Sequence, residues 1–216
     1  MVHSKTQGLI AALTGLPRVR SVNDIIIKDN FLEQLSFDYK TLGRLEVHRL
    51  KVADASELFN FYFTGLSEEA RNLFPPYPLF SPPVNSADEL AGRIRDWGKE
   101  KDWTVFKLVK DDVIIGVCLL KRWETYRPTS GLAVHEEFRN KGLGVLLQTI
   151  VNEQAVLLGL KMVYATVAPD NAASLRIHEK CGFKKTKKIV PHYGYKNGVR
   201  VMDRNDMELI LELKRK

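Results

Sequence analysis

A short basic segment with two glycines, Arg-Asn-Lys-Gly-Leu-Gly at residues 139–144, narrows the possible folds more than any other part of the chain. It follows an apolar run at residues 130–134 and opens an amphipathic segment at residues 143–158. This order predicts a buried strand, a basic turn and the start of a helix. The first amides of a helix have no partner within the helix and lie at its positive end. The segment therefore predicts an anion site, most simply for a pyrophosphate.

The two glycines of this segment have two possible roles. Gly142 and Gly144 lack Cβ atoms, which would let a phosphate approach the backbone, while Arg139 and Lys141 add positive charge. Alternatively, such glycines only permit tight packing of the helix. The segment lacks the Gly-Lys-Ser/Thr ending of a nucleotide triphosphatase loop, and it lacks the third glycine and the acidic residue of a dinucleotide fingerprint.

A second motif lies downstream. Residues 162–167 predict a buried strand, Pro169-Asp170-Asn171 ends it, and a helix at residues 172–180 stops before Gly182 and Phe183. The string at residues 171–183, Asn-Ala-Ala-Ser-Leu-Arg-Ile-His-Glu-Lys-Cys-Gly-Phe, resembles the C-terminal signature of the GNAT superfamily of acyl-CoA-dependent N-acetyltransferases. Arg139, Gly142 and Gly144 match the Arg/Gln-x-x-Gly-x-Gly/Ala motif that this family places at the pyrophosphate of coenzyme A.

The resemblance implies an α/β (α+β) fold of the GNAT type. Such a fold has a mixed, mostly antiparallel central sheet with flanking helices and a parallel crossover from the fourth strand through the third helix to the fifth strand. Alternating and apolar segments predict the strands, and Lys110-Asp-Asp112 predicts a hairpin. The predicted strands are residues 45–50, 103–109, 113–121, 129–135, 162–167, 183–190 and 207–213, and the predicted helices are 55–63, a short one after Ser67, 86–101, 143–158 and 172–180. Asp54, Ser67 and the box Ser86–Glu89 are the predicted helix caps.

The chain divides into residues 45–216, the expected acetyltransferase domain, and residues 1–44, an N-terminal extension without an assigned role. Within the extension, residues 23–35 predict a strand that leads into a helical turn. We expect the extension to pack on the domain or on a second subunit, as in a homodimer. The proline-rich segment at 74–83 is either a wall of the acceptor pocket or a surface connector that covers the core. Residues 191–206, between the last two predicted strands, are expected to form a loop with His192, Tyr193 and Tyr195 and a turn at Asn197-Gly198.

Composition limits the partners. The 216 residues carry a net charge of +7, part of which coenzyme A would use. The basic stretch at residues 176–188 contains no interleaved aromatic residues, so nucleic acid is an unlikely partner. No apolar run approaches the length of a membrane span, the N-terminal residues do not resemble a signal peptide, so none is expected, and two cysteines with scattered histidines predict no metal site. We therefore expect a cytoplasmic protein without a metal.

The resemblance also assigns the donor site. It implies that Leu132, Ala133 and Val134 pair with the pantetheine arm as an added strand would, and that an amide near Val134 polarises the thioester carbonyl. Asn171 is expected to bind the pantetheine arm, to cap the helix that follows, or to do both. The residues expected to bind coenzyme A are Leu132, Ala133, Val134, Arg139, Asn140, Lys141, Gly142, Leu143, Gly144, Val145, Asn171 and Ser174.

The catalytic residues are less well defined by the motifs. His178 stands where many relatives have a tyrosine that protonates the thiolate, and it is either a general acid or a structural histidine. Relatives that acetylate protein N-termini often carry a glutamate five positions before the asparagine, but this chain has Thr166 there. Glu124 is the substitute candidate for the general base; it is otherwise an exposed carboxylate beside Arg122, and water could accept the proton instead.

Two functions follow from the resemblance. The first is an enzyme in which a primary amine attacks the thioester of acetyl-CoA directly. Its acceptor is a small molecule or a protein, and the helix at residues 172–180 is somewhat closer to the branch that acts on small amino compounds, including phosphinothricin. The second is a non-catalytic sensor or interaction module that binds acyl-CoA without consuming it. The absence of the usual glutamate and tyrosine keeps this alternative open.

Overall fold

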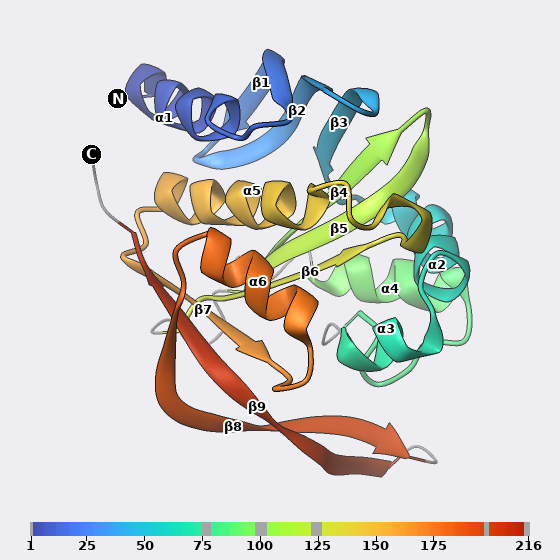
Figure 1. The fold of residues 1–216 in the computed structure, drawn as a ribbon. Coiled ribbons are helices and arrows are strands. Elements are labelled where there is room, and N and C mark those ends of the chain that lie inside the picture. Colours follow the sequence, from blue (N-terminus) through green and yellow to red (C-terminus); the bar gives the residue numbers. More distant parts are fainter. Residues whose placement is uncertain (1, 75–78, 98–102, 122–126, 197–198, 214–216) are drawn as a thin grey trace.

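The computed structural model describes residues 2–74, 79–97, 103–121, 127–196 and 199–213. Within these residues, one mixed sheet has the strand order β1-β2-β3-β4-β5-β6-β7-β9-β8 (Figure 1). The strands are β1 (Val19–Lys28), β2 (Phe31–Tyr39), β3 (Gly43–Arg49), β4 (Trp103–Lys110), β5 (Val113–Lys121), β6 (Thr129–Val134), β7 (Met162–Val167), β8 (Lys184–Lys196) and β9 (Val199–Glu212). The α-helices are α1 (Val2–Thr14), α2 (Ala55–Thr64), α3 (Glu68–Leu73), α4 (Ala87–Trp97), α5 (Leu143–Leu157) and α6 (Ala172–Lys180), with two short 3₁₀ turns, η1 (Val52–Asp54) and η2 (Glu136–Phe138).

The sheet confirms the predicted fold class, since most of its neighbouring strands are antiparallel. Strands β6 and β7 are parallel, are joined through α5, and pair only at Thr129 and Tyr164. The predicted hairpin between β4 and β5 is also confirmed. Asp111 and Asp112 have φ angles of 49° and 62°, the left-handed conformation that a two-residue hairpin turn requires.

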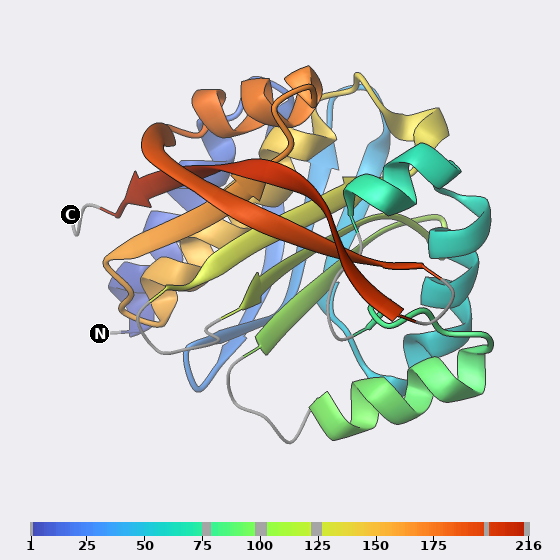
Figure 2. The ribbon, with the colours of Figure 1, turned by 90° about the horizontal axis from the view of Figure 1, so that it is seen from below.

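Two layers of helices enclose the sheet. Helices α1, α5 and α6 lie on one face, and α2 and α4 lie on the other (Figures 1 and 2). Under α5 the core contains Leu147, Ile150 and Val151, all fully buried. On the other face, Leu58 of α2 and Leu90 of α4 belong to a second core. The sheet therefore separates two hydrophobic cores.

The extension at residues 1–44 differs from the prediction. The helical turn expected within residues 23–35 is wrong, because β1 and β2 form a hairpin there. Asp29 and Asn30 occupy its turn with φ angles of 51° and 65°, which short polar residues adopt readily. The hairpin continues the central sheet beside β3, and α1 packs on α5 and β1. The extension is thus built into the sheet of the same chain.

The C-terminal hairpin is longer than predicted. Strand β8 runs through the expected loop, so His192, Tyr193 and Tyr195 lie on a strand. His192 contacts Asp203 across the hairpin, with 2.7 Å between Nδ1 and Oδ1. β-propensity and cross-strand pairs outweighed the turn signals there. The predicted turn at 197–198 lies outside the described residues.

The predicted helix caps are partly confirmed. The Ser67 hydroxyl accepts from the amide of Ala70 at 3.3 Å, and the Ser86 hydroxyl accepts from the amide of Glu89 at 3.1 Å. The predicted cap of α2 by Asp54 is wrong, because the Asp54 carboxylate instead accepts from the Lys51 amide. Helix α4 extends to Trp97, and the remainder of the predicted helix, 98–101, lies outside the described residues.

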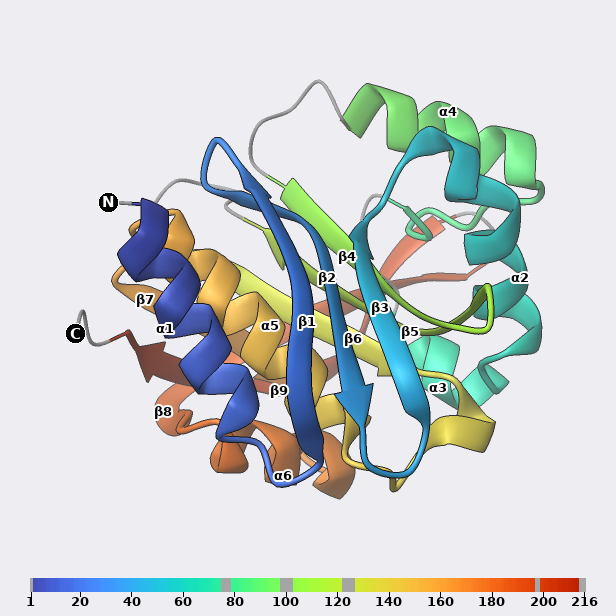
Figure 3. The same cartoon turned by 90° about the horizontal axis from the view of Figure 1, so that it is seen from above.

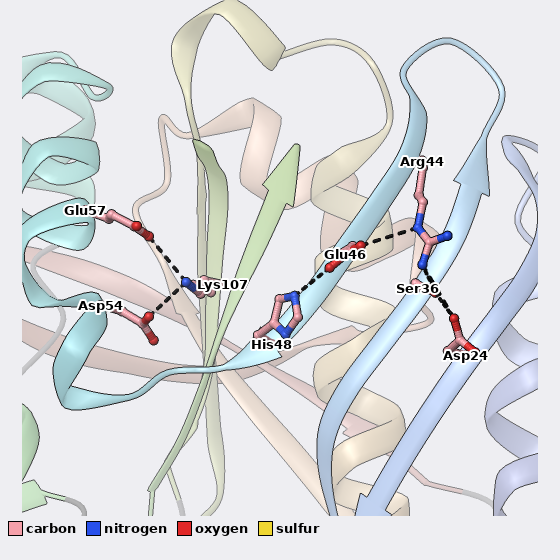
Figure 4. A network of polar contacts seen from close by, with 8 residues as sticks. All are labelled: Asp24, Ser36, Arg44, Glu46, His48, Asp54, Glu57 and Lys107. Carbon is pink, nitrogen blue, oxygen red and sulfur yellow. Dashed lines mark hydrogen bonds and ion pairs between the residues drawn. The ribbon is translucent and has the colours of Figure 1, made fainter. Parts of the chain in front are cut away.

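Polar side chains occupy part of the face of β1, β2 and β3 (Figure 4). Arg44 lies 3.5 Å from Asp24 and 3.3 Å from Glu46. Glu46 in turn contacts His48 at 2.9 Å. Pairs as exposed as these contribute little stability individually. They do, however, keep this face of the added hairpin polar, which suits a surface that water covers.

Candidate active site

The predicted phosphate turn begins α5. Gly142 has φ 83° and ψ 2°, and Asn140 also has a positive φ of 61°. The first helical hydrogen bond runs from the Leu146 amide to the Gly142 carbonyl at 3.3 Å. The amides of residues 143–145 therefore precede the hydrogen-bonded part of the helix, and Gly142 supplies no side chain to cap them. Such a turn presents free donors at the positive end of the helix dipole.

The two basic residues of the turn are only loosely held. Arg139 is 44% exposed and lies 3.5 Å from Glu136. Lys141 donates from Nζ to the carbonyl of Glu137 at 2.6 Å and lies over the ring of Phe138. Exposed contacts of this kind exchange easily for a stronger one with a phosphate.

The reason for the two glycines differs from the expected one. A Cβ on Gly142 would lie 2.8 Å from the Tyr39 hydroxyl, and a Cβ on Gly144 would lie 2.4 Å from Cδ1 of Ile177. Both Cβ positions thus point into protein. Gly142 is required for its left-handed conformation, and Gly144 for the close approach of α5 and α6. The packing alternative therefore accounts for Gly144, whereas the backbone conformation of the turn accounts for Gly142.

Strands β6 and β7 separate beyond their single point of pairing. The amide of Tyr164 donates to the carbonyl of Pro128 at 2.7 Å, and β6 has no further pairing with β7 in the described residues. Backbone groups alternate in direction along a strand, so those of Leu132 and Val134 point to the β7 side. Their amides and carbonyls line a gap that an extended chain could fill by strand-like pairing. Ala133 instead pairs with Val117 of β5.

Helix α6 begins beside this gap. The Oδ1 atom of Asn171 accepts from the amide of Ser174 at 3.0 Å, so Asn171 caps the helix as predicted. Its side-chain amide group remains able to donate to a ligand. Ser174 lies one turn before His178, with 3.4 Å between Oγ and Nδ1.

Comparison with known proteins agrees with this geometry. Residues 44–184 match the acetyltransferase (GNAT) domain family. The chain belongs to the GNAT superfamily. It is 30% identical over 132 residues to the L-methionine sulfoximine/L-methionine sulfone acetyltransferase of Pseudomonas aeruginosa, a match that covers 60% of this chain and 66%, just under two thirds, of that relative.

Solved GNAT structures share the fold at low sequence identity. A ribosomal-protein-S5-alanine acetyltransferase from Vibrio fischeri has a TM-score of 0.64 at 18% identity, covering 82% of this chain and 96% of that one. A spermidine N-acetyltransferase from Vibrio cholerae, solved with coenzyme A and spermine, has a TM-score of 0.61 at 19% identity, covering 78% and 95%. A putative acetyltransferase from Salmonella typhimurium, solved with acetyl-CoA, has a TM-score of 0.59 at 19% identity, covering 80% and 95%.

His178 lies in a buried environment that disfavours the acid role expected of it. The side chain is 4% exposed, and its ring packs edge-on against Phe183 with centroids 4.9 Å apart. Nδ1 lies 2.8 Å from the carbonyl of Ser174, so that nitrogen carries the proton and Nε2 is left as an acceptor without a partner among the described residues. Burial lowers the pKa of His178, although the hydrogen bond to Ser174 opposes this shift. A neutral imidazole with this tautomer has no proton at Nε2 to give to a thiolate.

The general base is not defined by the predicted residues. Glu124 lies outside the described residues. Thr166 on β7 pairs across the sheet with Glu208 of β9, a carboxylate that the sequence analysis did not single out. Glu208 is 5% exposed, forms an ion pair with Arg127 and accepts from the hydroxyl of Thr186 at 3.2 Å. These contacts indicate a structural carboxylate. The sequence signal for it is Glu208 itself, a charged residue between Met207 and the apolar run at residues 209–211.

A cleft of about 640 Å³ opens between α3 and the start of α6. Its lining residues are Glu68, Glu69, Asn72, Leu73, Asp170, Asn171, Ala172 and Ala173. Three carboxylates in this set make the cleft favourable for a protonated amine. Within the proline-rich segment at 74–83, residues 75–78 lie outside the described residues. Leu79 and Phe80 are core residues, and Phe74 lies against Gly131 of β6.

No helix in the part of the chain that the structure describes is long and apolar enough to cross a bilayer. The same residues contain no group of three or more potential metal ligands.

Proposed function

We propose that this protein is an N-acetyltransferase that moves the acetyl group of acetyl-CoA to the primary amine of a small molecule. The observation that carries the proposal is the arrangement of α5 and β6. The open first turn of α5 lies at the end of the connection from β6, and the backbone of β6 is unpaired on the β7 side at Leu132 and Val134. Together they form an anion site followed by a slot for an extended, amide-containing chain, as in the pantetheine of coenzyme A.

In the proposed reaction, the neutral amine attacks the thioester carbonyl carbon, a C–N bond forms and the C–S bond breaks. The backbone amide near Val134 stabilises the negative charge on the carbonyl oxygen. Asn171 and the amides of residues 143–145 hold the donor in place, together with Arg139 and Lys141. The amine loses one proton to solvent and the thiolate gains one, so no protein base is required. His178 has a positioning role in this scheme, because it closes α6 against Phe183.

A small-molecule acceptor is supported by the relative from Pseudomonas and by the size of the cleft. The relative's name states activity on methionine sulfoximine and methionine sulfone, which are amino acids of modest size. The carboxylates of Glu68, Glu69 and Asp170 would attract the amine of such a compound before it loses its proton.

The test is release of free thiol from acetyl-CoA with a panel of acceptors: methionine sulfoximine, methionine sulfone, phosphinothricin, spermidine and a peptide with a free N-terminus. Thiol release that depends on one of the small amines, with a product heavier by one acetyl group, is the expected result. Release only with the peptide would overturn the small-molecule acceptor. Absence of release with every amine, while acetyl-CoA still raises the melting temperature, would favour the acyl-CoA sensor.

Two variants that make the same change of charge at different places test the position of the donor site. Arg139→Glu reverses an exposed charge at the turn, and Lys28→Glu reverses an exposed charge at the far end of β1. Only the first is expected to raise the KM for acetyl-CoA. Gly142→Glu is less informative, because its positive φ and the contact with Tyr39 would disturb the fold as well.

A further inference from the structure

The N-terminal extension reaches the phosphate turn through two residues. The family match begins at residue 44, so residues 1–43 lie outside it. Arg18 immediately precedes β1, and Tyr39 ends β2; pairing of Val19 with Tyr39 brings them together. The Lys40 amide also donates to the Arg18 carbonyl at 2.8 Å, which fixes the backbone of Arg18. Figure 3 shows the start of β1 and the end of β2 beside the first turn of α5.

Both side chains contact the turn. The Tyr39 hydroxyl donates to the carbonyl of Lys141 at 2.7 Å. The position that a Cβ of Gly142 would take is 3.3 Å from Cδ of Arg18 and 3.5 Å from its Nε. Burial raises the pKa of Tyr39, and the charge of Arg18 opposes that shift, which agrees with a guanidinium close to the phenol. Arg18 therefore lies against the residue that begins α5.

The backbone of Arg18 is fixed, but its guanidinium is not neutralised. It has no hydrogen bond or ion pair from its side chain to any residue that the structure describes, and it is partly exposed. Arg44, Arg49, Arg93 and Arg127 of the same chain each have a carboxylate partner. An unpaired guanidinium beside the free amides of a helix start matches the geometry of a phosphate, which accepts two parallel hydrogen bonds from arginine.

We propose that Arg18 binds a phosphate group of coenzyme A, so that the N-terminal extension completes the donor site. Tyr39 acts as a positioning residue, because its hydroxyl fixes the carbonyl of Lys141 and with it the path of the turn. This inference rests on the proposed function. It gives the extension a role in donor affinity, beyond the extra strands that it adds to the sheet.

The experiment is calorimetric titration of acetyl-CoA into the full-length protein and three variants. Arg18→Ala is expected to weaken binding about tenfold, since a hydrogen bond between charged groups is lost. Arg18→Lys should recover part of the affinity. Lys28→Ala removes an exposed charge from the far end of β1, about 30 Å from Arg18, and should bind as the wild type does. Unliganded melting temperatures establish that each variant is folded.

Repeating the titration with dephospho-coenzyme A identifies the phosphate. If the effect of Arg18→Ala disappears with that ligand, Arg18 binds the 3′-phosphate; if it persists, Arg18 binds the pyrophosphate. Affinity for acetyl-CoA that is equal in Arg18→Ala and Lys28→Ala would overturn the inference while leaving the proposed function intact. No binding by the wild type would instead overturn the proposed function.

Discussion

At the scale of single residues, His178 illustrates how burial changes a side chain that a motif places at the catalytic centre. Burial lowers its pKa, so the folded protein resists protonation of the ring more than the unfolded chain does, whose histidine titrates near pH 6.5. The stability that follows from this difference is present above about pH 6.5 and is lost as the pH falls through the folded pKa.

The expected consequence is a smaller acid sensitivity in His178→Phe, which retains a ring against Phe183. The melting temperature should fall less between pH 7.5 and pH 5.5 in this variant than in the wild type. An equal fall in melting temperature in His178→Phe and in the wild type would show that protonation of His178 does not cause the loss of stability at low pH.

Gly144 tests the packing of α5 on α6. In Gly144→Ala the new methyl group would lie 2.4 Å from Cδ1 of Ile177, so one side chain must move. Overpacking of this kind costs roughly 1–3 kcal/mol, and the better helix propensity of alanine offsets up to about 1 kcal/mol of it. We expect a net loss of about 1 kcal/mol in urea denaturation. Ile177→Val, which lacks Cδ1, should remove most of this loss in the double variant; strictly additive effects would contradict the assigned contact.

At the scale of elements, the β1–β2 hairpin depends on one side chain of α5. Gln154 is fully buried; its Oε1 accepts from the Leu32 amide at 2.8 Å, and its Nε2 donates to the Asn30 carbonyl at 3.0 Å. Gln154→Leu would remove both hydrogen bonds and leave the Leu32 amide and the Asn30 carbonyl without these partners. The expected cost is about 2–3 kcal/mol in the free energy of unfolding.

Amide hydrogen exchange measures the effect of Gln154→Leu on the β1–β2 hairpin itself. Amides of residues 31–35 should exchange faster in Gln154→Leu, while those of β4 and β5 should change only through the loss of global stability. Unchanged protection of the hairpin would mean that the sheet pairing with β3 is sufficient to hold it.

The elements that local patterns determine were predicted well. Helix α6 ends at a glycine stop signal, the β4–β5 hairpin has its turn residues between two apolar runs, and strand β7 is a short apolar run ended by a proline. Each of these signals lies within a few positions of the element that it predicts. The β1–β2 hairpin was missed because its turn is held from α5, more than 120 residues later. Asp54 precedes α2, but one of its carboxylate oxygens accepts from the Lys51 amide and the other pairs with Lys107 of the distant strand β4. Long-range contacts of this kind leave no local pattern.

In the candidate site, too, local motifs predicted some features, while other features depend on residues that are distant in the sequence. The motif predicted an anion turn at residues 139–144, and the structure has a helix start there whose first amides lack a side-chain cap. It could not reveal that both glycines face protein, or that Arg18 and Tyr39 of the extension lie against the turn. The state of His178 depends on its burial, which follows from packing against Phe183.

At the scale of the whole molecule, the proposed donor and acceptor sites lie at the starts of two helices. The predicted donor turn begins α5, on the face of the sheet covered by α1, α5 and α6 (Figure 1). The carboxylate-lined cleft lies between α3 and the start of α6. The opening proposed for the thioester is the β7 side of β6, which has no pairing with β7 beyond Thr129 in the described residues. The proposed function thus gives the donor and the acceptor separate sites, with direct transfer between them.

The central claim is that the protein binds acetyl-CoA at this opening, and thermal unfolding with and without the ligand tests it most directly. A ligand at a hundred times its Kd stabilises the folded state by about 2.7 kcal/mol. For a chain of this size that corresponds to a rise in melting temperature of roughly 5–10 °C. We predict such a rise with acetyl-CoA and a clearly smaller one in Arg139→Glu. No rise with acetyl-CoA at millimolar concentration would contradict the donor site, and with it the proposed transfer reaction.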